Sequence, residues 1–246
     1  MNDATIPNRG ATSEERILIL GGGSTLATSF INEVLQNQSN AHATVLSSTL
    51  DDDLLISSDK LSIVKVDWTN YEGVQFELRK LAYESEFAGV ISFLGVQGRH
   101  PIDNVMDYIE NARAVYTSNV TLPVLLVQDI IKDNLVGSGS FFFMTSRAGS
   151  ISERGTLEHH HPGGNNVYRS SKAALNMAVR CLAFDYANRH RFLLVHPGFF
   201  ISKSNKDMKA APTKLFADKM IKLYKSADHY SSGSFIDLET GKLISF

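Results

Sequence analysis

Short apolar runs alternate along this chain with longer stretches in which apolar residues recur every three or four positions. Runs of the first kind are typical of buried strands, and stretches of the second kind are typical of helices. Seven strands are predicted, at residues 16–20, 44–46, 63–66, 89–93, 141–144, 192–196 and 234–236. Five helices are predicted, at residues 26–36, 71–83, 112–132, 167–188 and 213–225. Because this alternation is typical of parallel sheets, and several strands are apolar on both faces, we predict an α/β fold of the Rossmann type. Its doubly wound, mostly parallel seven-stranded sheet would carry helices on both faces.

The length and composition are consistent with one domain. The chain has 246 residues, 43% of them hydrophobic, which is enough for one substantial core, and no repeat or low-complexity run divides it. We expect a single domain at residues 16–246 after a flexible polar arm at residues 1–15, which lacks the apolar core of a secretory signal. We also expect no membrane span, because no run reaches the ~18 apolar residues that a span needs.

Charge and cysteine content narrow the class of partner. The formal net charge is −2 and the isoelectric point is about 6.4, so neither nucleic acid nor a membrane surface is an expected partner. Cys181 is the single cysteine, which excludes an internal disulfide and fits a reducing cytoplasm. We therefore expect a small-molecule partner and a cytoplasmic location.

Tyr168 and Lys172 stand four residues apart at the start of a predicted helix, so they share one face of it. An ammonium group near a phenol favours the phenolate and lowers a pKa that is ordinarily about 10. Such a pair taken alone is more often an ordinary helix start. Here Ser146 follows one predicted strand and His196-Pro197-Gly198 follows another, and parallel sheets bind ligands at that edge. This position favours proton-transfer chemistry, with Ser146 holding a substrate oxygen.

A glycine-rich turn, Gly21-Gly22-Gly23-Ser24-Thr25, joins the first predicted strand to the first predicted helix. The amides at that helix start could receive a pyrophosphate. The alternative is a turn that only connects a strand with a helix.

With these motifs the chain resembles the short-chain dehydrogenase/reductase family, from about residue 16 to the C-terminus. The family's Asn-Ser-Tyr-Lys tetrad matches Asn119, Ser146, Tyr168 and Lys172, and its Pro-Gly signature matches Pro197 and Gly198. Segments 146–151, 168–176 and 233–237 look like the C-factor and Sniffer-type carbonyl reductase branch.

The resemblance implies an NAD(P)-dependent oxidoreductase that transfers a hydride between nicotinamide and a carbonyl or secondary alcohol of a small molecule. Tyr168 would be the acid/base, and Lys172 would lower its pKa and bind the nicotinamide ribose. Ser146 would orient the carbonyl oxygen, and Asn119 would support a water that leads protons to Lys172. A homodimer or homotetramer is also implied.

The resemblance also implies a set of cofactor contacts. These are Gly22, Ser24, Thr25, Leu26, Ser48, Asp67, Trp68, Leu94, Gly95, Tyr168, Lys172, Pro197, Gly198 and Phe200. The glycine motif departs from the family, because Leu26 and Thr28 stand at its second and third glycines. Leu26 must point away from a dinucleotide or displace it. Ser47 and Ser48 stand where NAD-preferring members carry an acidic residue, so we predict NADP rather than NAD.

These departures leave two alternatives open. One is a regulatory or binding protein on the same scaffold without redox turnover, and the other is a non-redox acid/base tailoring enzyme of a biosynthetic pathway.

Four further features of the sequence bear on the site. Residues 159–161 are contiguous histidines, which rarely bind one ion together, so we expect no metal site and a loop that shapes the substrate mouth. Arg147 and Arg169 could recognise an acidic substrate group or form structural ion pairs. Phe199 and Phe200 could line an apolar pocket or belong to the core. Residues 201–212 match the family's mobile lid.

Overall fold

The computed structural model describes residues 14–246 except 51–54, 85, 100, 156–163 and 201–210. The arm expected at residues 1–15 therefore lies almost entirely outside the described residues. So do the histidines at 159–161 and most of the segment matched to a lid.

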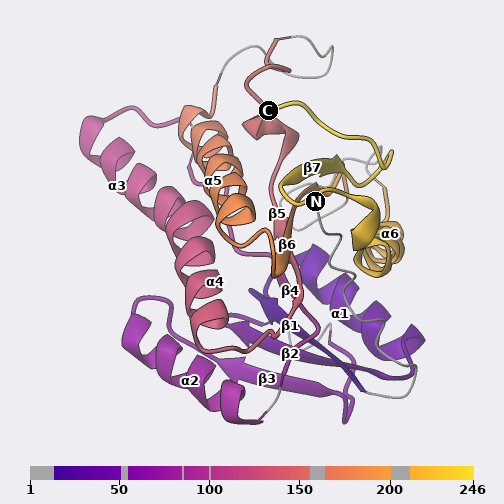
Figure 1. The fold of residues 1–246 in the computed structure, drawn as a ribbon. Coiled ribbons are helices and arrows are strands. Elements are labelled where there is room, and N and C mark those ends of the chain that lie inside the picture. Colours follow the sequence, from indigo (N-terminus) through magenta and orange to yellow (C-terminus); the bar gives the residue numbers. More distant parts are fainter. Residues whose placement is uncertain (1–13, 51–54, 85, 100, 156–163, 201–210) are drawn as a thin grey trace.

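A seven-stranded sheet forms the centre of the molecule (Figure 1). Its strands are β1 Glu15–Leu20, β2 Ala41–Ser47, β3 Leu61–Lys65, β4 Gly89–Ser92, β5 Gly139–Met144, β6 His190–His196 and β7 Ser234–Asp237. Their order is β3-β2-β1-β4-β5-β6-β7, and every neighbouring pair is parallel. The predicted Rossmann-type architecture is confirmed, with a sheet that is wholly rather than mostly parallel.

Two hydrophobic cores lie on opposite faces of this sheet. Alternate residues of one strand enter different cores: Phe141 and Phe143 pack in one, and Phe142 packs in the other. This alternation explains why the strands are apolar without interruption. The first core is closed by α2 Tyr71–Glu84, α4 Leu122–Lys132 and α5 Asn166–Asp185, and the second by α1 Thr25–Asn37 and α6 Thr213–Lys225.

The helix predicted at 112–132 begins earlier than expected. It starts as α3 Val105–Tyr116, passes through the π-helical turn η2 Thr117–Thr121 and continues as α4. Asn104 caps it, because its side chain accepts a hydrogen bond from the backbone of Asp107. The first turns lack a buried stripe, since Val105 is 73% and Met106 is 65% exposed, and periodicity therefore missed them.

The continuous stretch Val105–Lys132 is long and apolar enough to cross a membrane by length and composition. The sequence expectation concerned uninterrupted apolar runs, whereas this test uses mean hydropathy over a window. Length and mean hydropathy are weak evidence for a span, because a core helix passes the same test and 44% of the most apolar part is buried here. Leu126, Val127 and Ile130 of this stretch are fully buried in the core beneath α4.

From β1 the strands β2 and β3 are added toward one edge of the sheet, and from β4 onward they are added toward the other, so β1 and β4 are neighbours although two strands separate them in the sequence. In doubly wound folds a crevice opens at the carboxyl ends of the strands at such a switch point. The turn after β1 and the segment after β4 both begin at this place, as do the segments after β5 and β6 at the same edge.

Candidate active site

Ser146 lies in the turn after β5 and caps the short 3-10 helix η3 Arg147–Gly149. Its hydroxyl oxygen accepts a hydrogen bond of 3.2 Å from the backbone of Ala148. Gly149 brings the turn against α5, since a Cβ there would stand 2.7 Å from the carbonyl carbon of Lys172. The absence of a side chain at this position therefore places Ser146 beside the first turns of α5.

Tyr168 and Lys172 occupy those first turns. The Tyr168 phenol lies close enough to the Ser146 hydroxyl for that group to lower its pKa, and the Lys172 amine lies 5.9 Å from the centre of the Tyr168 ring. Lys172 is only 4% exposed, and its Nζ donates a 3.0 Å hydrogen bond to the carbonyl oxygen of Met144 at the end of β5. Residues 22 to 26 positions apart in the sequence thus meet at one edge of the sheet, as their spacing predicts.

Burial is the main cause of the pKa shifts of both Tyr168 and Lys172. It raises the pKa of the Tyr168 phenol above its ordinary value, against the lowering effects of the Ser146 hydrogen bond and the Arg169 charge. Burial also lowers the pKa of Lys172 to about 8. In this arrangement the phenol is a proton donor at neutral pH. The lowering of the Tyr168 pKa by Lys172 stays a prediction.

Asn119 is completely buried within the π-helical turn η2. Its Oδ1 accepts a 2.6 Å hydrogen bond from the backbone of Val96, and its Nδ2 donates to the Val96 carbonyl and to the Ser171 hydroxyl. The side chain therefore fastens the segment after β4 to α5. A Cβ on Gly95 would stand 3.0 Å from both Asn119 Oδ1 and Lys172 Nζ, so a glycine is needed where these groups converge. The predicted water relay through Asn119 stays a prediction.

The glycine turn after β1 is held by hydrogen bonds that the family motif does not predict. The Gly22 amide donates to the Ser47 hydroxyl, and Thr28, at the third glycine position, donates its hydroxyl to the Gly22 and Ser24 carbonyls. Ser24 caps α1 by accepting from the Ala27 amide. Leu26 is partly buried and packs against the core beneath α1 and α6, which favours a side chain that points away from a dinucleotide.

The other expected cofactor contacts lie along the same edge. Asp67 is exposed after β3 and accepts hydrogen bonds from the Thr69 amide and hydroxyl, which lower its pKa and keep it ionised. Trp68 is partly buried against the first core, and Leu94 is buried in it. Ser48 is partly exposed directly after β2.

Pro197 and Gly198 follow β6, and Gly198 has a φ of +98°, a conformation that side chains disfavour. Phe200 is 7% exposed, with its ring centre 5.6 Å from that of Phe216, so its side chain belongs to the core. Phe199 is 59% exposed. The core interpretation thus holds for one of the two phenylalanines only.

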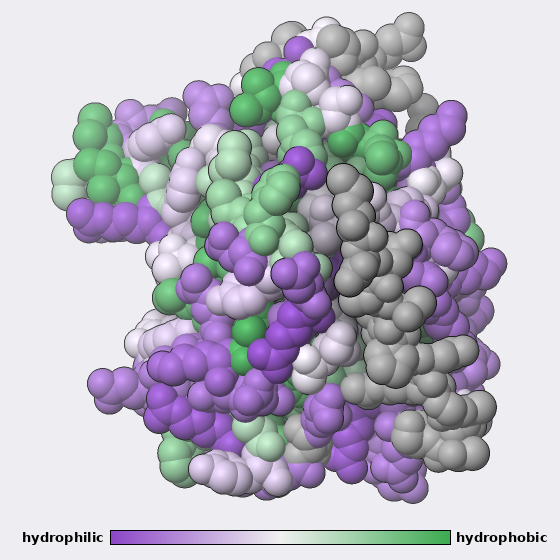
Figure 2. All heavy atoms as spheres, viewed as in Figure 1, coloured by the Kyte–Doolittle hydropathy of each residue, from purple (hydrophilic) through white to green (hydrophobic). Residues whose placement is uncertain are grey.

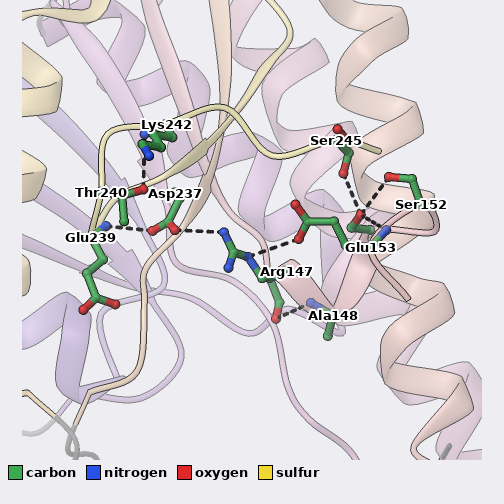
Figure 3. Close-up of polar contacts among 11 residues, drawn as sticks. Arg147, Ala148, Ser152, Glu153, Asp237, Glu239, Thr240, Lys242 and Ser245 are labelled. Atoms are coloured by element: carbon green, nitrogen blue, oxygen red, sulfur yellow. Dashed lines mark hydrogen bonds and ion pairs between the residues drawn. The ribbon is translucent and has the colours of Figure 1, made fainter. Parts of the chain in front are cut away.

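Arg147 extends from the Ser146 turn and lies between two carboxylates (Figure 3). Its guanidinium donates a 2.9 Å hydrogen bond to Asp237 at the end of β7, and it makes a 3.3 Å charge contact with Glu153. Ser150 donates to the carbonyl of Ser245, which joins the same turn to the C-terminal segment. Of the two interpretations of Arg147, the structural ion pair is therefore the one that the geometry favours.

Sequence reasoning missed Asp237 and Glu153. Asp237 is 90 residues from Arg147, and no local pattern connects the two. Arg169 is used differently, because its Nε donates to the carbonyl of Gly164 just before α5. In the part of the chain that the structure describes, no group of three or more histidine, cysteine or acidic side chains could hold a metal ion.

No protein-family model matches the chain. Two curated proteins are similar to parts of it. Protein FixR of Bradyrhizobium diazoefficiens is 30% identical over 115 residues, which are 45% of this chain and only 38% of FixR. The C-signal protein of Myxococcus xanthus is 27% identical over 151 residues, which are 61% of this chain and 87% of that protein.

Solved structures match over nearly the whole chain. The carbonyl reductase Sniffer of D. melanogaster is 17% identical with a TM-score of 0.76, over 95% of this chain and 100% of that one. The NADPH-bound carbonyl reductase from chicken fatty liver is 21% identical with a TM-score of 0.76, over the same shares of the two chains. The resemblance to Sniffer-type short-chain dehydrogenases/reductases that the motifs indicate is thereby confirmed in the fold.

Proposed function

We propose that the protein is an NAD(P)-dependent oxidoreductase that transfers a hydride between nicotinamide and a carbonyl or secondary alcohol of a small molecule. The observation that carries this proposal is that the Ser146 hydroxyl, the Tyr168 phenol and the buried amine of Lys172 lie close together at the sheet edge where ligands bind. A carbonyl reductase with the same fold binds NADPH, which supports the choice of cofactor.

The residues around the glycine turn fit a dinucleotide. Ser24 caps α1 through the Ala27 amide, and the amides of Thr25 and Leu26 stand at the positive end of the helix, where a pyrophosphate binds best. Leu26 stands where the family motif has a glycine, and a side chain there could displace a dinucleotide. Because Leu26 packs against the core, it favours a position away from the bound cofactor. At the other side of the switch point, Gly95 provides close access to Lys172.

The remaining contacts of the cofactor are proposed from the resemblance. Asp67 would accept a hydrogen bond from the adenine amine, and Trp68 would lie beside it. Leu94, Pro197, Gly198 and the backbone near Phe200 would complete the site. When bound, the nicotinamide would supply the hydride in the direction of reduction.

The chain's own residues would manage the proton and the substrate oxygen. Ser146 orients the carbonyl oxygen by a hydrogen bond, and Tyr168 donates its proton to that oxygen as the carbonyl carbon receives the hydride. The raised pKa of Tyr168 keeps this proton in place at neutral pH until it is needed. Lys172 binds the ribose and returns a proton to the phenolate, for which a pKa of about 8 is well matched.

Within this proposal NADP is preferred over NAD. The Ser47 hydroxyl is engaged by the Gly22 amide and the Thr49 carbonyl, and residues 47–50 carry no carboxylate that would repel a 2′-phosphate. The acidic residues at 51–53 lie outside the described residues. Titrating NADPH and NADH against the fluorescence of Trp68, the single tryptophan, measures the two affinities.

Replacing Tyr168 by phenylalanine tests the catalytic role. The variant keeps the ring but loses the proton donor, so we expect turnover to fall at least about 100-fold while NADPH binding is kept. Tyr83→Phe is the matched control, because that side chain is 93% exposed. Unchanged turnover in Tyr168→Phe would refute the assignment.

A second candidate is a binding protein on this scaffold without redox turnover. It is favoured by the departure at the glycine motif, where Thr28 fills the position of a glycine and is bonded to the carbonyls of the turn. Saturable NADPH binding argues against this candidate, and the absence of binding by either dinucleotide favours it.

We also propose a homodimer, or a homotetramer built from such dimers, in the cytoplasm. Hydrophobic residues gather at the outer end of α3 and over α5 (Figure 2), where Met106, Met177 and Phe184 are each more than 60% exposed, at 65%, 67% and 74%. Light scattering after size-exclusion chromatography determines the assembly.

A further inference from the structure

A cavity of about 200 Å³ lies beside the first turn of α5. It is bounded by the loop after β4, by α3 and by the residues that directly precede Tyr168. Among its lining residues are Arg99, Ile102, Tyr108, Asn111, Asn166 and Val167. Val167 directly precedes Tyr168, so the cavity lies beside the helical turn that carries the proposed acid/base.

Arg99 is the one charged side chain among the residues that line the cavity. It is exposed, and the structure shows no acidic partner for it among the described residues. The cavity also borders the N-terminus of the 20-residue helix α5, which carries a partial positive charge. The electrostatic character of the cavity therefore favours an anion.

Asn111 adds an observation that is independent of the helix end. It is 6% exposed, and its Oδ1 accepts a 2.7 Å hydrogen bond from the Arg99 amide, which fixes the loop to α3. Its Nδ2 has no partner among the residues that the structure describes. Asn111 is one of the residues that line the cavity, so an amide donor in this position is suited to a ligand oxygen.

The loop that carries Arg99 packs closely against α3. Gly98 has a φ of +72°, and a Cβ there would stand 2.5 Å from the Val115 side chain and 2.7 Å from Asn111 Oδ1. Only a glycine allows this approach. The guanidinium of Arg99 is therefore presented from a backbone whose position is determined by α3.

We propose that this cavity binds the carboxylate of the carbonyl substrate, so that the protein acts on oxo acids. The inference rests on the proposed function, and it adds the substrate class. Arg99 would form a charge-assisted hydrogen bond with the carboxylate, Asn111 Nδ2 would donate to one of its oxygens, and the α5 N-terminus would stabilise its charge. Ile102 and Val167 would contact the carbon chain between the carboxylate and the carbonyl.

The test uses the full chain with NADPH and a series of methyl-ketone acids from levulinate to 7-oxooctanoate, each paired with its neutral methyl ester. For at least one chain length we expect the KM of the acid to be roughly tenfold or more below that of its ester, as a charge-assisted hydrogen bond provides. Arg99→Gln should remove most of this difference by raising the KM of the acid, with kcat and the ester parameters kept.

Two further variants separate the site from a general effect of charge. Arg113→Gln removes the same charge from an exposed position of α3 that does not line the cavity, and it should keep the preference for the acid. Asn111→Asp keeps an acceptor for the Arg99 amide but replaces the Nδ2 donor by an oxygen that repels the carboxylate. It should weaken binding of the acid and leave the ester unaffected.

Binding of 7-oxooctanoate and its ester, followed by saturation-transfer NMR without NADPH, makes the two proposals separable. If no ketone is reduced but the acid binds in an Arg99-dependent way, the carboxylate subsite stands and the redox function is wrong. If ketones are reduced with no preference for the acids at any length, or if the preference survives Arg99→Gln, the subsite is refuted and the redox function stands.

Discussion

The ion pair between Arg147 and Asp237 should determine how firmly the Ser146 turn is held. Asp237→Asn removes the charge but keeps an amide oxygen that can accept the 2.9 Å hydrogen bond from the Glu239 amide. Exposed ion pairs contribute less than ~1 kcal/mol, whereas removing one partner of a buried pair costs about 3–5 kcal/mol. The side chains of Arg147 and Asp237 are 26% and 8% exposed, so this pair lies between those limits. We expect unfolding free energy to fall by about 2 kcal/mol.

The same change should affect catalysis more than substrate binding. Arg147 is next to Ser146 in the sequence, and a turn that is held less firmly misplaces the Ser146 hydroxyl relative to Tyr168. We expect a roughly tenfold lower kcat with little change in KM, because small misplacements mainly raise the barrier of the chemical step. Arg147 and Asp237 act here as positioning residues.

Urea unfolding and steady-state kinetics of Asp237→Asn provide the measurements, with Asp228→Asn as the control. Asp228 is exposed on the 3-10 helix Ala227–His229 and should give wild-type values in both assays. The double variant with Arg147→Gln completes a mutant cycle, in which the two losses should not add. An Asp237→Asn protein with unchanged stability and unchanged kcat would refute the reasoning.

Two other predictions follow from buried titratable groups. Burial lowers the pKa of Lys172 from 10.5 to about 8. Below pH 8 the buried charge therefore reduces the free energy of unfolding by up to about 3 kcal/mol. This loss disappears as the pH rises toward 10.5, the pKa of lysine in the unfolded chain. Lys172→Met removes this charge and also loses the hydrogen bond to Met144. Its free energy of unfolding in urea at pH 7 should be about 2 kcal/mol higher than that of the wild type, while turnover is lost. A less stable variant would contradict burial as the cause of the lowered pKa. Burial, helped by the charge of Arg189, lowers the pKa of His190 to about 4, and neither of its ring nitrogens has a partner among the described residues. Between about pH 6.5 and pH 4 the His190 imidazole is protonated in the unfolded chain but not in the folded protein. The free energy of unfolding therefore falls as the pH falls through this range, by about 2 kcal/mol at pH 5. His190→Leu should flatten this part of the stability–pH curve, and an unchanged slope would be evidence against the assigned pKa.

The order of the elements could be predicted because each strand and most helices carry a local signal. Uninterrupted apolar runs such as Phe141-Phe142-Phe143 indicate strands covered on both faces, and the two cores confirm it. The start of α3 could not be predicted in the same way. Its apolar side chains are exposed rather than buried, and Val105 and Met106 belong to no core stripe.

In the candidate site, too, contacts between residues close in the sequence could be predicted and contacts between distant residues could not. The four-residue spacing of Tyr168 and Lys172 is local, and the structure places the two groups on one side of α5 as expected. The degree of burial depends on the whole fold, and it raises the pKa of Tyr168 against the direction that spacing alone suggests. The Arg147–Asp237 pair and the cavity beside Arg99 join segments far apart in the chain, so no local pattern predicts them.

The most direct test of the central claim is a calorimetric titration of the purified protein with NADPH. The account predicts saturable binding at one site per chain with a dissociation constant in the micromolar range, about −8 kcal/mol. It also predicts weaker binding by the Lys172→Met variant, which lacks the proposed ribose contact. The absence of saturable heat for NADPH and for NADH up to millimolar concentrations would contradict the account.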